Sequence, residues 1–198
     1  AYSYDETHNN WFNIGGFEKC QPYYTRLCEA YAYMDDVKPF IRAYFNPIGG
    51  LVDKEILTFW EHFMRGGGWN KTHETGWFLE QTRLMLLMER GEELWVGPFV
   101  TTHWMEDGMV VGVRQAPTDF GQTAFKITSH VKDGYIEAEI DVPSRNKPEA
   151  VVIRLRHPEE KKMKRVSVNG EEWKEFDAER EIVRVEDWDG EITVKAFY

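Results

Sequence analysis

The sequence is short of cysteine and of positive charge, and it has no long apolar run. Its 198 residues include 2 cysteines, and 24 Lys and Arg against 34 Asp and Glu give a formal net charge of -10. This deficit of cations argues against nucleic acid or an anionic membrane surface as a partner, because both are bound by clustered Lys and Arg. No apolar run approaches the length of a bilayer span, so a membrane-crossing helix is not expected.

The two cysteines do not predict a disulfide or a metal site. In a helix, Cys20 and Cys28 would lie roughly 12 Å apart, which is too far for a disulfide. We expect buried thiols, and the cysteines leave the redox compartment undecided. The first residues, "AYSYDETHNN", have no signal-peptide character and no initiator Met, which is typical of a mature form or an excised fragment.

Three catalytic motifs are also missing from the most chemically varied stretch, "LTFWEHFMRGGGWNKTHETGW", residues 57–77. A phosphate loop needs Gly before the Lys, and Asn70 stands there. A zinc-protease H-E-x-x-H motif needs a second His where Trp77 stands, and His62 with His73 are too few ligands for a metal site. A G-x-S-x-G nucleophile motif is absent. No metal or organic cofactor is implied.

Residues 1–95 carry helical patterns. "QPYYTRLCEAYAYMDD" places apolar residues at helical spacing, "DDVKPFIRAYFNPIGG" repeats the pattern after Asp35 or Asp36 as a cap, and "WFLEQTRLMLLMERGEE" is dense in helix formers. We expect the second helix to end at Asn46-Pro47 and Gly49-Gly50, and the third at Gly91. Helices so rich in aromatics expose more apolar surface than they can bury against each other, so we expect missing partners.

Residues 96–198 change to a period of two. "TAFKITSHV" and "GYIEAEIDV" alternate apolar and polar residues around a turn at Lys132-Asp133-Gly134, and further turns are expected at Asn169-Gly170 and near Asp189-Gly190. Short strands at intervals of roughly ten residues predict an antiparallel β-sandwich. The sequence therefore divides into a helical part, 1–95, and a sandwich, 96–198.

The composition of residues 57–77 suits a sugar site. Tryptophan faces stack on pyranose rings, and a carboxylate can activate water at an anomeric carbon. The stretch offers Glu61 and Glu74 among tryptophans, next to a Gly-rich loop. The alternative is an ordinary core with solvated or capping carboxylates, and composition alone leaves both interpretations open.

The order of motifs resembles the C-terminal end of bacterial α-L-rhamnosidases and their relatives. Thr58, Trp60 and Glu61 match the "T-x-W-E" pattern of that family, and "NKTH", with Asn70 and His73, occupies the place of its Asn-His loop with a departure from its pattern. The residues from "VVGVRQAPTDF" to "VVIRLRHP" resemble the terminal domain. The resemblance implies an α+β, two-part fold: an N-terminal helical segment from an (α/α)6 barrel of six helical hairpins, followed by an antiparallel β-sandwich.

That resemblance also implies an activity, the inverting hydrolysis of glycosidic bonds in plant or microbial saccharides. Glu61 would be the general base, and the implied substrate-binding residues are Trp60, Trp69, Asn70, His73, Trp77 and His62. The general acid would lie elsewhere, and Asp5 and Glu6 are candidates only by composition. The implied partners are a saccharide substrate and the remainder of the barrel, on the same or a separate polypeptide. A bacterial source is implied, with a cytoplasmic and a secreted location both open.

A second hypothesis belongs to another functional class. The chain could be a non-catalytic carbohydrate-binding or structural module, in which the sandwich binds glycan and the helical aromatics dock on another subunit. The two hypotheses differ in what they require of Glu61, because only the enzyme needs its carboxylate.

Overall fold

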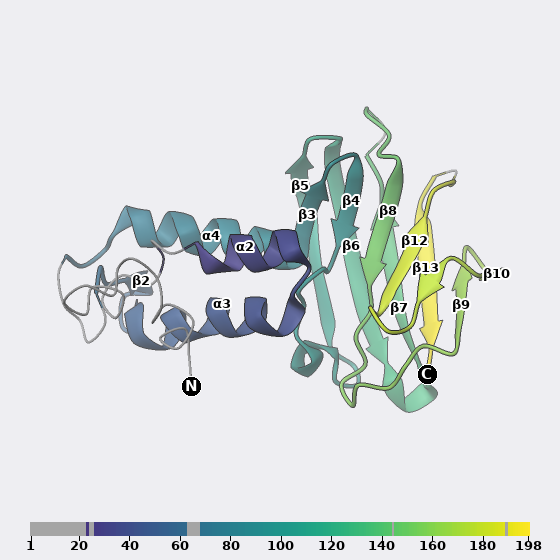
Figure 1. Cartoon of the computed structure of the whole chain (residues 1–198), viewed down its shortest axis with the longest axis horizontal. Coiled ribbons are helices and arrows are strands. Elements are labelled where there is room, and N and C mark those ends of the chain that lie inside the picture. The colour runs from purple at the N-terminus through teal and green to yellow at the C-terminus, as the bar shows by residue number, and fades with distance from the viewer. Residues whose placement is uncertain (1–22, 24–25, 63–67, 144, 189) are drawn as a thin grey trace. The chain divides into compact units, whose positions relative to one another are not determined.

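The computed structural model describes residues 23, 26–62, 68–143, 145–188 and 190–198. The chain divides into two units, residues 1–84 and 85–198, which are described separately (Figure 1). The described part is mostly β, with three α-helices followed by a β-rich region. The expected fold class is therefore wrong: the described residues form no six-hairpin helical barrel. None of these helices is long and apolar enough to cross a membrane.

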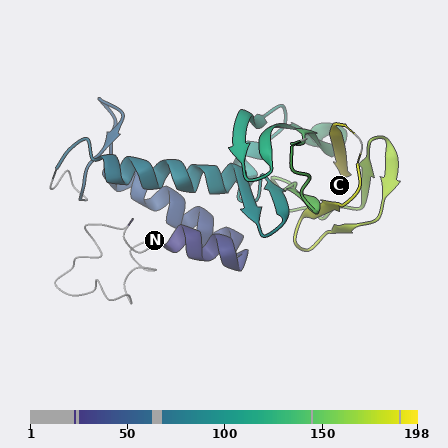
Figure 2. The same ribbon diagram turned by 90° about the horizontal axis from the view of Figure 1, so that it is seen from above.

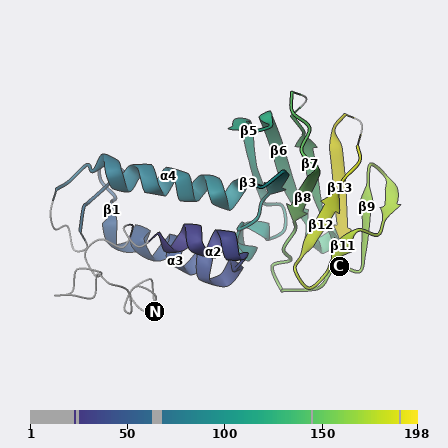
Figure 3. The same ribbon diagram turned by 45° about the horizontal axis from the view of Figure 1, so that its top comes forward.

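The first unit contains helices α2 (Leu27–Met34), α3 (Val37–Leu51) and most of α4 (Thr72–Leu86), together with the short strands β1 (Val52–Asp53) and β2 (Thr58–Phe59). The helices α2 and α3 lie side by side and correspond to the two expected amphipathic segments, which are confirmed (Figures 1 and 3). Cys28 is a buried free thiol, whereas Cys20 lies outside the described residues.

The helix ends differ from the expectation. Asp36 is the N-cap residue of α3, but its side chain makes no capping hydrogen bond, and the helix runs past Pro47 to the fully buried Leu51. Pro47 removes a single backbone donor in the last turns, and the burial of Leu51 offsets that loss. The third helix ends at Leu86 instead of Gly91, because its apolar run "LMLLM" continues as a buried strand, and periodicity alone does not separate the two.

The helical unit buries an aromatic cluster and leaves other apolar side chains in water. Tyr23, Leu51 and Phe59 form its buried core, with Phe78 packed against them. The ring centroids of Phe59 and Phe78 are 5.1 Å apart. The large apolar side chains of this unit that remain exposed are Tyr33, Met34, Phe45, Ile56, Leu57, Trp69 and Leu79.

The second unit is a two-sheet β-sandwich. A six-stranded sheet has the order β10 (Glu171–Trp173), β9 (Arg165–Val168), β13 (Ile192–Phe197), β7 (Tyr135–Asp141), β6 (Gly121–His130) and β5 (Val110–Thr118). A five-stranded sheet has the order β11 (Phe176–Asp177), β12 (Ile182–Val185), β8 (Ala150–Arg154), β4 (Glu93–Val96) and β3 (Leu87–Arg90). Two short 3-10 helices, Thr102–Met105 and Val131–Asp133, lie in the connections.

One core joins the two sheets. Inward-facing residues of both sheets pack together into this core. The view along the strands shows the two sheets as separate layers (Figure 2). The inward-facing residues include Leu94, Val96, Val151 and Ile153 from one sheet and Ile127, Ile136, Ile140, Val166 and Val194 from the other. The expected turns at Lys132–Gly134 and Asn169-Gly170 are confirmed, with positive φ angles at Gly134, Asn169 and Gly170.

One feature of the sandwich contradicts the expectation. The sheets are not wholly antiparallel, because β4 pairs with β8 in parallel. Near the expected turn at Asp189-Gly190, Gly190 has a positive φ of 76°, and the chain passes there from β12 in one sheet to β13 in the other. Asp189 itself lies outside the described residues.

Gly112 in β5 is the glycine whose replacement the sheet tolerates least. A Cβ atom at this position would lie 2.3 Å from the carbonyl oxygen of Phe125 on the paired strand β6. We expect Gly112→Ala to lower the free energy of unfolding by about 1–3 kcal/mol, because the strands must move apart.

Chemical denaturation followed by tryptophan fluorescence checks this prediction. Val110→Thr, an exposed β-branched control on the same strand, should stay within about 0.5 kcal/mol of the original chain. Equal stability of Gly112→Ala and the original chain would contradict the close approach.

Candidate functional site

A short hairpin fixes the position of the predicted base. The strands β1 and β2 pair with Asp53 opposite Thr58, and the backbone N–H of Trp60 donates to the carbonyl of Leu51 at 2.8 Å. Phe59 is buried, so it anchors the hairpin in the aromatic cluster of the helical unit. Because Trp60 and Glu61 follow this anchor directly, their backbone is held in place.

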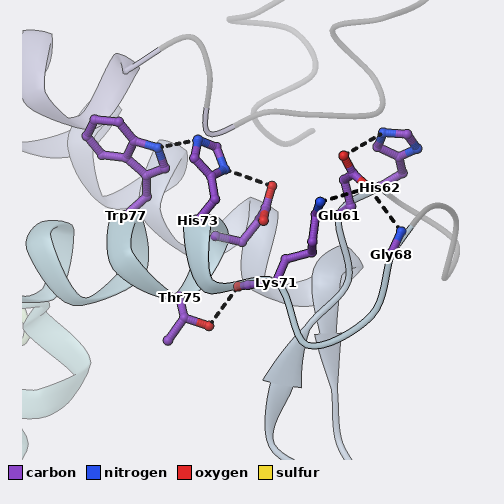
Figure 4. A network of polar contacts seen from close by, with 8 residues as sticks. Glu61, His62, Gly68, Lys71, His73, Thr75 and Trp77 are labelled. Carbon is purple, nitrogen blue, oxygen red and sulfur yellow. Dashed lines mark hydrogen bonds and ion pairs between the residues drawn. The ribbon is translucent and has the colours of Figure 1, made fainter.

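The carboxylate of Glu61 lies close to polar groups of Gly68, Lys71 and His62 (Figure 4). Its Oε2 accepts a hydrogen bond from the backbone N–H of Gly68 at 3.0 Å and lies 3.3 Å from Nζ of Lys71. Its Oε1 lies 4.0 Å from Nε2 of His62. The backbone N–H of Glu61 donates in turn to the carbonyl of Gly68 at 2.9 Å, so the two residues are joined in both directions.

These contacts favour the ionised form of Glu61. The hydrogen bond from the Gly68 amide lowers its pKa below the ordinary value, partial burial opposes that change, and Lys71 lowers the pKa further. A quarter of the side chain remains exposed, so water reaches the carboxylate. At a pH equal to the ordinary pKa of a glutamate, the Glu61 carboxylate is therefore still mostly ionised. It becomes protonated only at a lower pH.

Gly68 is suited to this role by its lack of a side chain. A Cβ atom there would lie 3.3 Å from the Lys71 stem and 3.4 Å from Oε2 of Glu61. Glycine thus lets the backbone amide approach the carboxylate without crowding the ammonium group. Gly68 and Lys71 are site residues that the sequence prediction missed, because an amide contact has no sequence signature.

The loop between Gly68 and α4 is tied back to the hairpin. Asn70 has a positive φ of 55°, and its Oδ1 accepts a hydrogen bond from the Thr58 hydroxyl at 2.9 Å. The backbone N–H of Lys71 donates to the carbonyl of Phe59 at 3.1 Å. The predicted residues Thr58 and Asn70 therefore meet, and their contact orders the loop that carries Lys71.

His73 and Trp77 bind each other at the start of α4. The indole N–H of Trp77 donates to Nε2 of His73 at 2.8 Å, and Nδ1 of His73 lies 3.0 Å from Oε1 of Glu74 (Figure 4). Because indole nitrogen only donates, Nε2 of His73 is the acceptor of this bond, and its Nδ1 faces the Glu74 carboxylate. Both ring nitrogens are therefore engaged, and the Arg26 guanidinium lies 4.5 Å from the centre of the Trp77 ring.

Glu74 differs from the solvated carboxylate that composition suggested as one alternative. Its side chain is almost fully buried, one oxygen faces His73, and the other has no hydrogen-bond partner among the described residues. Glu74 thus orients the His73 ring. The i, i+4 spacing of His73 and Trp77 is a sequence signal for their contact on one helix face.

The three predicted tryptophans have different surroundings. Trp60 donates from its indole nitrogen to Oδ2 of the buried Asp53 at 3.1 Å. Trp77 is held by His73 and Arg26, whereas Trp69 has 62% of its surface exposed. Of the three, Trp69 is the indole that presents most surface to a ligand.

Two further expectations concern groups beyond this network. The general-acid candidates Asp5 and Glu6 lie outside the described residues. Within the described part, no group of three or more His, Cys, Asp or Glu side chains could hold a metal ion.

Comparisons with known proteins give distant structural likenesses and no match to a named family. No sequence-family model and no curated protein matches the chain. A solved structure described as "Glycoside hydrolase" aligns with a TM-score of 0.45 and 13% sequence identity. The alignment covers 88% of this chain but 30% of that one, so the chain spans about a third of its length. The likeness is one of chain path only, and it shows neither a rhamnosidase nor a barrel.

The contacts of Glu61 predict how its pKa responds to the loss of Lys71. In Lys71→Met, the pKa of Glu61 should rise but remain below its ordinary value, because the Gly68 amide still donates to the carboxylate. A pH titration of the Glu61 side-chain carbonyl by carbon NMR measures this change.

Lys126→Met removes an ion pair with Glu139 in the β-rich unit and is the matched control. It should leave the titration of Glu61 unchanged. A Glu61 pKa that is unaltered by Lys71→Met would contradict the described ion pair.

Proposed function

We propose that the chain takes part in the hydrolysis of glycosidic bonds, with inversion at the anomeric carbon and with Glu61 as the general base. The observation that carries this proposal is the state of Glu61: an ionised carboxylate, reached by water and fixed by Gly68 and Lys71. The substrates are rhamnosides or related glycosides of plant or microbial saccharides. The proposal does not require a helical barrel.

The chemistry needs a carboxylate that is charged before the reaction begins. In an inverting hydrolysis, the base takes a proton from a water molecule while that water attacks the anomeric carbon. The lowered pKa keeps Glu61 ready to accept this proton as the pH falls. Oε2 is held by the Gly68 amide and Lys71, and Oε1 faces His62 at 4.0 Å, so the carboxylate is fixed in one orientation toward the attacking water.

The surrounding residues divide into two roles in this proposal. Trp69 offers an exposed ring for stacking on a pyranose face, and His62 and the amide nitrogen of Asn70 are placed to bind hydroxyls. The other predicted substrate-binding residues, Trp60, His73 and Trp77, hold the hairpin and the start of α4 through their mutual or buried hydrogen bonds.

A complete inverting site also needs a general acid. Its carboxyl group should lie about 6.5–9.5 Å from that of Glu61, leaving room for the attacking water. The acid protonates the leaving oxygen from the opposite side of the sugar. We expect this general acid among residues outside the network of Glu61, Gly68 and Lys71.

A second candidate function is a non-catalytic carbohydrate-binding or structural module. The observation that favours it is that His73, Trp77, Trp60 and Asn70 already use hydrogen bonds on each other or on neighbouring residues, as in a structural network. A binding module predicts saccharide affinity without hydrolysis and without dependence on Glu61.

The direct test is Glu61→Gln in the full-length protein, assayed with aryl α-L-rhamnosides and other aryl glycosides. Glutamine keeps an oxygen that can accept from Gly68, so the loop should hold its structure. We expect turnover to fall by about 100-fold or more with little change in KM, because a general base contributes roughly 10²–10⁴-fold.

Two further variants separate catalysis from structure. Glu55→Gln changes an exposed carboxylate in the same hairpin and should retain full activity. Sodium azide should restore part of the turnover that Glu61→Ala loses, because the azide anion attacks the anomeric carbon without having to lose a proton. A Glu61→Gln variant that retains a large fraction of the original rate would rule out the assignment.

A further inference from the structure

The outer face of the six-stranded sheet contains a hollow of about 410 Å³ over β5, β6 and β7. These three strands are neighbours in the sheet (Figures 1 and 3). The volume falls within the range of about 300–1,000 Å³ in which small-molecule sites are found. The hollow belongs wholly to the β-rich unit, and Glu61 is not among its lining residues.

Two small residues create this hollow. Gly112 pairs with Lys126 across β5 and β6, and Ala124 pairs with Asp141 across β6 and β7. On these outward-facing positions a glycine and an alanine leave space that larger side chains would fill. The contact with the Phe125 carbonyl excludes even a Cβ atom at Gly112, so the depth is built into the backbone.

Charged side chains of both signs surround the two small residues. Lys126 and Glu139 form an ion pair with each other. Arg114, Asp141 and Glu191 line the hollow, and their side chains make no hydrogen bond or ion pair within the described part of the chain. Arg114 lies at a register shift in β5, next to Gln115 with a φ of 54°, and such bulges redirect side chains beside binding sites.

The hollow continues beyond Asp141 and Glu191. A second hollow of about 360 Å³ shares Asp141 and Glu191 with the first and extends to Trp188 and Lys147. The Lys147 ammonium lies 4.2 Å from the centre of the Trp188 ring. We call these two adjoining hollows the sheet groove: Asp141 and Glu191 line both hollows, and Trp188 lines the second.

We propose that the sheet groove binds an oligosaccharide. Each sugar hydroxyl both donates and accepts hydrogen bonds, so neighbouring hydroxyls match a site that offers a guanidinium donor and two carboxylate acceptors together. The lining holds three cations, Arg114, Lys126 and Lys147, and three carboxylates, so it favours a neutral polar ligand over an ion of either sign. Trp188 adds an indole of the kind that stacks on a sugar face. The two adjoining hollows, of about 410 and 360 Å³, give room for more than one sugar ring. This binding is independent of the function proposed for Glu61.

The test is a titration of the whole chain with maltotriose, xylotriose and cellotriose, followed by nitrogen-proton NMR. At least one of these probes should shift the backbone amides of Gly112 and Ala124 and the indole signal of Trp188. The double variant Asp141→Asn with Glu191→Gln should weaken that binding by about tenfold or more, because both acceptors are weakened while side-chain shape is kept.

Matched controls distinguish this proposal from the function of Glu61. Glu171→Gln with Glu172→Gln removes the same charge from exposed positions of β10 and should leave the affinity unchanged. Glu61→Gln should also leave it unchanged.

Three results would overturn the proposal: no shift of the groove signals with any probe, equal affinity of the Asp141 and Glu191 double variant, or shifts confined to Trp69 and its neighbours. The last result would place saccharide binding in the helical unit. Loss of hydrolysis in Glu61→Gln with groove binding retained would support both proposals.

Discussion

The candidate site depends on one interaction, the hydrogen bond from the Gly68 amide to the Glu61 carboxylate. This bond is the largest cause of the lowered pKa of Glu61, and the return bond from Glu61 to the Gly68 carbonyl fixes its direction. Lys71 adds a positive charge next to this partly exposed carboxylate. A backbone donor is less adjustable than a side chain, so the anion keeps one position.

Two sets of contacts keep that bond in place from opposite ends of the loop. The hairpin presents Glu61 because Phe59 is buried in the aromatic cluster, and the start of α4 presents Lys71 because its backbone is bonded to Phe59. The His73, Glu74 and Trp77 chain stabilises the first turns of the same helix. His73 and Trp77, which the sequence predicted as sugar-contacting residues, thus help to hold the start of α4. Trp69 remains exposed to a ligand.

The sequence predicted local features better than long-range ones. Helices α2 and α3 and the turns at Gly134 and Gly170 follow from periodicity and turn chemistry, which act over a few residues. The parallel pairing of β4 with β8 joins strands far apart in the chain, and no local pattern encodes it. The barrel expectation failed because it came from a resemblance carried by a short motif. In the site, Glu61 could be singled out by its aromatic neighbours, but its partner at Gly68 could not.

The most direct measurement is proton NMR of the sugar released when the full-length protein hydrolyses an aryl α-L-rhamnoside. A general base that activates water gives inversion, so the account predicts that β-L-rhamnose forms first and the α anomer accumulates later by mutarotation. Release of α-L-rhamnose as the first product would contradict the role of Glu61 as a base. The absence of hydrolysis with every aryl glycoside tested would contradict the enzymatic account as a whole.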